Sequence, residues 1–173
     1  ALAPLSPVCA FSDLALLPDG DVVATDAVGA RLVRIDVSTG TIAQLNQGGG
    51  AFSADGTDIA EATLEIPSAI ATDVFGRIFF SDCGTHPLVR MMDVDGLLHT
   101  VAGSGALGTA LVRMRVDATS IPLYCVPAGA LEVDRRGHAY FAVEGGNRAV
   151  FEVDTAGQLV MLGGYDACAT AAC

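Results

Sequence analysis

Short apolar runs, interrupted by glycine, proline or aspartate, follow one another along the 173-residue chain. Several alternate apolar and polar positions, as in "LVRID" at 32–36 and "VFEVD" at 150–154, and many contain β-branched or aromatic residues. A period of two is typical of a strand with one buried face, whereas frequent turn residues would break a helix. The pattern therefore predicts an all-β chain of short strands and tight turns.

The same series of runs occurs three times, at a spacing of roughly 60 residues, which indicates an internal structural repeat. In each copy one glycine follows the first run and another follows the third run: Gly20 and Gly40, Gly76 and Gly96, Gly137 and Gly157. Each copy predicts four antiparallel strands, at 14–17, 22–25, 32–36 and 41–45, then 69–72, 78–81, 88–93 and 97–102, then 130–133, 139–143, 149–154 and 158–162. The third runs match with a one-residue slip allowed. Arg34 and Arg90 occupy equivalent positions in them, where we expect the two side chains to cover the surface of the repeated unit or to pair with nearby carboxylates.

Four-stranded antiparallel units joined in series are typical of propeller blades. The units resemble NHL repeats of six-bladed β-propellers, and the resemblance includes the glycine-rich connector "GGGAFSADGTDIAEATLEIP" at 48–67. It implies one propeller segment over 1–173, with a short helix at 59–63. We expect blades at about 8–47, 66–105 and 126–164, connectors at 48–65 and 106–125, and a cysteine-containing tail at 165–173.

Three blades are half of the ring that this family closes, and an open arc would leave unpaired sheet edges. The resemblance therefore implies that protein partners complete the ring. These are either the remaining blades of a parent polypeptide or neighbouring subunits, for instance of an extracellular filament or appendage.

The net charge of −11, with all nine basic residues being arginine, argues against nucleic acid as a partner. No apolar run approaches the roughly 20 residues of a membrane-spanning helix, so membrane insertion is not expected. The five cysteines form no C-x-x-C pair and fit no zinc spacing. They favour disulfides, and therefore an extracellular or cell-surface location reached through the secretory pathway or periplasm.

Propeller topology, if the resemblance holds, places the loop after a second strand near the connector that enters the next blade. Cys83 and Cys125 are then expected to bridge neighbouring blades. Cys9 lies at nearly the position of Cys125 in its own blade and would need a partner from another blade or chain. Cys168 and Cys173 are expected to pair locally or to reach outward.

Carboxylates recur at strand ends. Asp26 and Asp82 end second strands, and Asp36, Asp93 and Asp154 end third strands. Side chains at such positions commonly accept backbone N–H hydrogen bonds of a turn, and we expect this structural role for all of them.

The competing interpretation is a metal site on the propeller axis. Among the residues of the three copies, Asp26, Asp82 and His86 are the ones expected to approach such a site on the upper face. We expect no catalytic residue, metal or cofactor, and a non-catalytic structural or protein-interaction module. The alternative is part of a six-bladed hydrolase or lyase with a metal on its axis.

Overall fold

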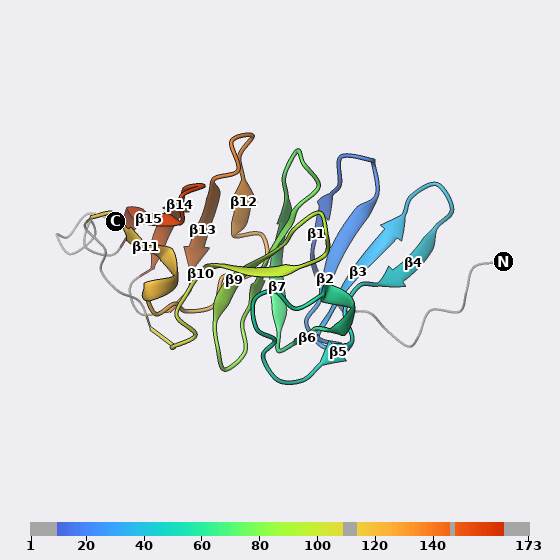
Figure 1. Cartoon of the computed structure of the whole chain (residues 1–173), viewed down its shortest axis with the longest axis horizontal. Coiled ribbons are helices and arrows are strands. Elements are labelled where there is room, and N and C mark those ends of the chain that lie inside the picture. Colours follow the sequence, from blue (N-terminus) through green and yellow to red (C-terminus); the bar gives the residue numbers. More distant parts are fainter. Residues whose placement is uncertain (1–9, 109–113, 146–147, 165–173) are drawn as a thin grey trace.

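The structure is a computed structural model that describes residues 10–108, 114–145 and 148–164. Three twisted antiparallel sheets lie in a row along the long axis of the molecule (Figure 1). Blade one contains β1 (Phe11–Leu16), β2 (Val22–Asp26), β3 (Arg31–Asp36) and β4 (Thr41–Gln44). Blade two contains β7 (Pro67–Thr72), β8 (Ile78–Asp82), β9 (Leu88–Met92) and β10 (Leu98–Ala102). Blade three contains β12 (Leu131–Val133), β13 (Ala139–Val143), β14 (Ala149–Val153) and β15 (Gln158–Gly164).

The all-β prediction of four-stranded antiparallel blades is therefore confirmed. Blade three differs in one respect, because a fifth strand, β11 (Val116–Asp117), pairs with its outer strand β15. Blade two has a shorter version of the same contact, an isolated bridge between Asp58 and Leu97. In both blades the preceding connector thus covers part of the outer sheet edge, which would otherwise present unpaired backbone groups.

The connectors carry small elements of their own. In the first, β5 (Gly48–Gly49) pairs in parallel with β6 (Thr63–Leu64), and a 3-10 helix spans Ile59–Glu61. A second 3-10 helix at Ala118–Ser120 occupies the other connector. Asp58 and Asp117 cap the two helices by accepting hydrogen bonds from the N–H groups two residues later, a role that suits aspartate.

The hydrophobic core lies between neighbouring blades, because successive side chains of a strand point to opposite faces of its sheet. Ile78 and Phe80 of β8 pack against blade one, while Phe79 between them packs against blade three. In blades two and three we call the side turned toward the preceding blade the front face, and the opposite side the back face. In blade one the back face is the side that packs against blade two, and the front face is the other side. Ile78 and Phe80 thus lie on the front face of blade two, and Phe79 lies on its back face.

The expected equivalence of Arg34 and Arg90 is wrong. Arg34 pairs across the sheet with Val23, whereas Arg90 pairs with Phe80, which corresponds to Ala24 of blade one. The loop between Asp82 and Leu88 is one residue longer than the loop between Asp26 and Arg31, and a one-residue shift moves a side chain to the other face of the sheet. Arg34 consequently lies on a back face and Arg90 on a front face.

Within the part of the chain that the structure describes, no helix reaches the length and apolar character that a membrane span requires.

Candidate functional site

Asp26 and Asp82, which were expected on the upper face, end the second strands β2 and β8, and His86 lies in the loop after β8. Glu65, in the connector before β7, contacts Asp82 and His86 and was not among the expected residues. We refer to Asp26, Glu65, Asp82, Cys83 and His86 together as the rim. Their contacts show which of them are free for chemistry and which of them hold the backbone in place.

Asp82 ends β8 and is 3% exposed. Its Oδ1 accepts a hydrogen bond from the Ile66 N–H at 2.6 Å, and both of its oxygens accept from the Glu65 N–H, at 3.1 and 3.0 Å. Burial raises the pKa of Asp82 above its ordinary value, against the lowering effect of these hydrogen bonds. The donors belong to the connector that leads into β7 and not to the turn after Asp82, so the expectation of a turn residue needs correction. Asp82 holds the start of its own blade.

Asp26 occupies the matching position in blade one and is fully buried. It accepts hydrogen bonds from the Gly29 N–H at 2.9 Å and from Arg31 Nη2 at 2.6 Å. Burial opposes ionisation, but the Gly29 N–H and the Arg31 guanidinium outweigh it and hold the pKa of Asp26 below its ordinary value. Both oxygens are therefore engaged within the loop that Asp26 begins.

The third-strand aspartates each accept two backbone N–H hydrogen bonds from the turn that follows: Asp36 from Ser38 and Thr39, Asp93 from Asp95 and Leu97, and Asp154 from Ala156 and Gln158. Polar contacts lower the pKa of all three, led by the Ser38 hydroxyl for Asp36, the His99 ring for Asp93 and the Gln158 N–H for Asp154. The same arrangement occurs at Asp73 and Asp134 in first-to-second-strand turns, which the sequence analysis did not single out.

Cys83 and Cys125 form a disulfide, with their Cα atoms 4.8 Å apart. The bond joins the loop after β8 to the chain that enters blade three. Next to it, Ser81 Oγ donates to the Val126 carbonyl at 2.7 Å, so blades two and three are fastened twice within a few residues. Cys9, Cys168 and Cys173 lie outside the described residues.

His86 is linked to Asp82 through Glu65. The His86 N–H donates to Glu65 Oε2 at 3.0 Å, and the Thr85 hydroxyl donates to Glu65 Oε1. Burial opposes ionisation of Glu65, yet the Thr85 and His86 hydrogen bonds lower its pKa. The His86 side chain is 53% exposed, and its Nδ1 lies 3.4 Å from Glu65 Oε1. The Glu65 side chain is 14% exposed and both of its oxygens accept hydrogen bonds, so the His86 imidazole is the rim group most open to solvent. Glu65 carried no repeat signal in the sequence.

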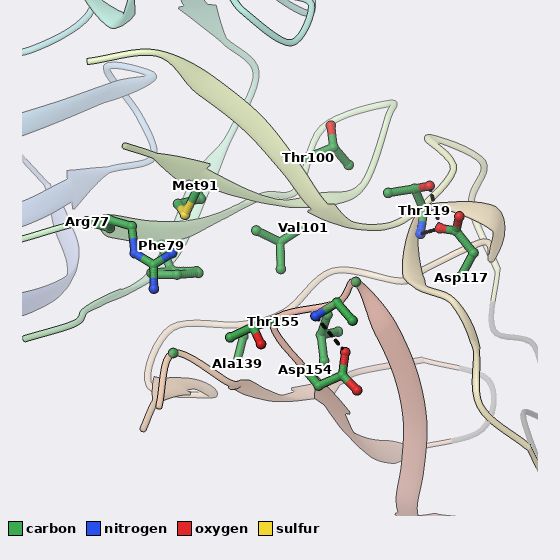
Figure 2. Close-up of a pocket in the computed structure, with 14 residues that line it drawn as sticks. Arg77, Phe79, Met91, Thr100, Val101, Asp117, Thr119, Ala139, Asp154 and Thr155 are labelled. Atoms are coloured by element: carbon green, nitrogen blue, oxygen red, sulfur yellow. Dashed lines mark hydrogen bonds between the residues drawn. The ribbon is translucent and has the colours of Figure 1, made fainter. Parts of the chain in front are cut away.

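A cleft of about 320 Å³ separates blades two and three (Figure 2). Its walls include Arg77, Phe79 and Met91 from the back of blade two and Ala139 and Val153 from the front of blade three. A smaller cleft of about 270 Å³ occurs between blades one and two, where Ile78 and Met92 stand at the positions of Ala139 and Val153. The cleft between blades two and three is the larger of the two because the smaller side chains of Ala139 and Val153 line it. It is thus a repeated feature of blade packing.

The Arg77 guanidinium forms one side of the larger cleft. Its Nε lies 2.5 Å from Asp73 Oδ2, and its Cζ lies 5.4 Å from the Phe79 ring centre. Asp154 on the opposite side is paired with Arg115. Each of these two charged groups therefore already has an ionic partner.

No protein-family model matches the chain, and no curated protein matches it either. Among solved structures, it is similar to virginiamycin B lyase from Staphylococcus aureus, with 15% identity and a TM-score of 0.56 over 93% of this chain and 43% of that chain. It is also similar to a gluconolactonase from Xanthomonas campestris, with 17% identity and a TM-score of 0.60 over 89% of this chain and 47% of that one. It is similar as well to the calcium-binding protein regucalcin from Agrobacterium tumefaciens, with 17% identity and a TM-score of 0.55 over 89% of this chain and 44% of that chain.

These proteins are six-bladed propellers, and the chain is a segment of a β-propeller. The chain spans less than half the length of each of the three. At this level of identity the similarity establishes the fold alone.

A cation at the rim would need several side chains whose oxygens or nitrogens are not already engaged. Asp26 is engaged by Arg31, Asp82 by the connector backbone, and Glu65 by Thr85 and His86. The His86 imidazole, 53% exposed, is the rim side chain most open to a ligand. Ca²⁺ takes six to eight oxygen ligands. Among the described residues, no group of three or more His, Cys, Asp or Glu side chains is arranged to hold a metal ion. The rim of this segment does not fit a metal centre.

Proposed function

We propose that the chain is an NHL-type propeller segment that acts as a non-catalytic structural or protein-interaction module. The observation that carries this proposal is the use of the rim carboxylates. Asp26 and Asp82 are the aspartates expected to approach an axial site, and the hydrogen bonds of both instead hold loops and connectors. Groups used in this way stabilise the surface that a rigid ring offers to other proteins.

The partners we propose are proteins: the remaining blades of a parent polypeptide or neighbouring subunits of an extracellular assembly. The Cys83–Cys125 disulfide supports a location outside the reducing cytosol, because such bonds form and persist in oxidising compartments.

A second candidate is part of a propeller hydrolase or lyase. It is favoured by the similarity in fold to virginiamycin B lyase and gluconolactonase, and by the contact of Glu65 with the solvent-exposed His86 imidazole. A carboxylate beside an imidazole can exchange a proton with a bound molecule, which is the least that general acid–base catalysis needs.

One experiment separates the two candidates. The disulfide-intact protein is titrated calorimetrically with Ca²⁺ and with Zn²⁺, and lactone hydrolysis is followed by pH-stat with and without each ion. The non-catalytic proposal predicts no stoichiometric binding at the rim and no rate above that of the heat-denatured protein. Lactone turnover, with stoichiometric binding of Ca²⁺ or Zn²⁺, that disappears in both Glu65→Gln and His86→Ala would instead support the hydrolase or lyase candidate.

A further inference from the structure

Blade one presents an apolar front face at one end of the row of sheets (Figure 1). The cross-strand pairs Leu14–Ala24, Leu16–Val22, Val22–Ile35 and Ile35–Ile42 place these side chains on one side of the sheet. Leu14 is 62% exposed and Leu16 is 66% exposed. Neither hydrophobic cluster between the described blades includes them.

The corresponding face is buried in both of the other blades. Ile70 of blade two, at the position of Leu14, is 3% exposed, and Ile78, at the position of Val22, is 2% exposed against blade one. Ala139 and Phe141 of blade three are each 1% exposed against blade two. Ala24 and Val33 of blade one's front face are themselves 1% and 2% exposed, so the contrast rests on Leu14 and Leu16. The front face of blade one therefore repeats a pattern that the molecule elsewhere uses to bind the back of another blade.

The back face of blade three, at the opposite end of the row, packs against no other described blade. Tyr140 pairs with Glu152 and Ala142 with Val150 on this side of the sheet, and Val150 is 43% exposed. The matching residues of blade two, Phe79 and Ser81, are 3% and 1% exposed because blade three covers them.

We propose that a second copy of this chain covers both faces, so that two three-bladed arcs close into one six-bladed ring around a two-fold axis. The inference rests on the proposed function and names its partner. The chain aligns over 93% and 89% of its residues with 43% and 47% of two six-bladed proteins, so two copies supply the blades of one ring. Closed two-fold symmetry is the commonest arrangement of soluble oligomers, and it leaves no blade face open.

The seam between the two copies differs chemically from the two interfaces within the chain. Thr25 Oγ1 donates to the Ser68 carbonyl at 2.6 Å, and Ser81 Oγ donates to the Val126 carbonyl at 2.7 Å. Blade three has Ala142 at this position, so the seam lacks this hydroxyl hydrogen bond. Each copy also carries a net charge of −11, and salt screens such repulsion. Association is therefore expected to strengthen as ionic strength rises.

The test is the molar mass of the purified protein, measured by light scattering after size exclusion over a range of concentration and salt. Accessible thiols are first alkylated so that disulfides cannot link the copies. The expected mass is twice that of the 17.6 kDa chain. Leu14→Glu should weaken association at least ~100-fold, because closure would bury an unpaired charge. The neutral variant Leu14→Asn should also weaken association. Ala142→Ser should strengthen association, because the new hydroxyl could donate to the backbone carbonyl of Ser12 in the second copy, which stands at the position of Ser68.

Val94→Glu is the matched control. Val94 is 68% exposed in the turn between β9 and β10, so this variant adds the same charge away from both end faces and should remain dimeric. A folded wild-type protein that stays monomeric at all concentrations and salt levels overturns the inference, as does a dimer that Leu14→Glu leaves intact. The mass measurement is independent of the metal and lactone assays, so the two proposals can fail separately.

Discussion

Asp13 in the innermost strand of blade one accepts a hydrogen bond from the backbone N–H of Gly129 in blade three, with a distance of 2.8 Å from Oδ2 to N. The same oxygen accepts from the Ile70 N–H of blade two at 3.1 Å. One carboxylate on β1 thus connects all three blades where their innermost strands converge, 116 residues apart in the sequence for the longer contact. Ala69 and Ala130 stand at the corresponding positions of the other copies, so this link is unique to blade one among the described blades.

Replacing Asp13 by alanine should lower the free energy of unfolding by about 2 kcal/mol, because the backbone N–H groups of Leu14, Ile70 and Gly129 lose their acceptor. Asp13→Asn keeps one acceptor oxygen and should cost less. Urea unfolding followed by circular dichroism measures both values. Asp19→Ala is the control, since Asp19 is 54% exposed in its ion pair with Arg34 and such pairs contribute about 1 kcal/mol at most. Equal losses of unfolding free energy in Asp13→Ala and Asp19→Ala would show that the hydrogen bonds of Asp13 to blades two and three stabilise the protein no more than a surface ion pair does.

The disulfide should contribute more than any single hydrogen bond. It joins residues 42 positions apart, and the chain-entropy model gives on the order of 4 kcal/mol for a loop of that length. The Cys83→Ser/Cys125→Ser double variant is therefore expected to show a markedly lower Tm than the oxidised wild type. Dithiothreitol should lower the Tm of the wild type toward that of the double variant and should leave the variant itself unchanged. A wild-type Tm insensitive to reductant would contradict the assignment.

The sequence predicted those features of the fold that depend on neighbouring residues. Turn glycines and alternating runs located the twelve blade strands, because turns and pleats are governed by local backbone preferences. It could not locate β11, which has two residues and exists because β15 is beside it. The donors to Asp82 and Asp13 were equally out of reach, since they come from segments brought close only by blade packing.

The two arginines show how a single residue decides the environment of a side chain. Counting along the repeat placed Arg34 and Arg90 together, but the longer loop after Asp82 turned Arg90 to the front of its blade. There the side chain is buried, and its Nη1 donates to the Ser53 carbonyl at 3.0 Å. Arg34 remains at the surface, paired with Asp19 and Asp21. No residue-type pattern distinguishes these two outcomes.

Arg90→Ala should therefore destabilise the protein by about 2 kcal/mol, the order of a hydrogen bond from a charged group, because the Ser53 carbonyl loses its donor and the half-exposed Asp55 loses its partner. Arg90 also lies over the Phe52 ring, 5.0 Å from its centre, and Nη2 contacts Asp55 at 3.2 Å. Loss of these contacts should increase proteolytic cleavage within 51–58, detected by mass spectrometry after brief digestion. Arg34→Ala, as the paired control, should cost less than about 1 kcal/mol and leave the cleavage pattern unchanged. Similar free energies of unfolding for Arg90→Ala and Arg34→Ala would argue against a stabilising role of the contacts that Arg90 makes with the connector.

Asp26 and Asp82 should respond to acid in opposite directions, although they occupy the same position of the repeat. The pKa of Asp82 is raised on folding by burial, so its ionisation costs stability that is recovered as the pH falls from above its folded pKa toward the ordinary value of 3.8. The pKa of Asp26 is lowered on folding, so its ionised form stabilises the protein above the ordinary value, and this contribution is lost as the pH falls through its folded pKa. The free energies of unfolding of the wild type, Asp26→Asn and Asp82→Asn, measured by urea between pH 7 and pH 3, test both signs. On acidification the wild type should gain stability relative to Asp82→Asn and lose stability relative to Asp26→Asn. If the two stability differences instead change with pH in the same direction, the environments described for these carboxylates are wrong.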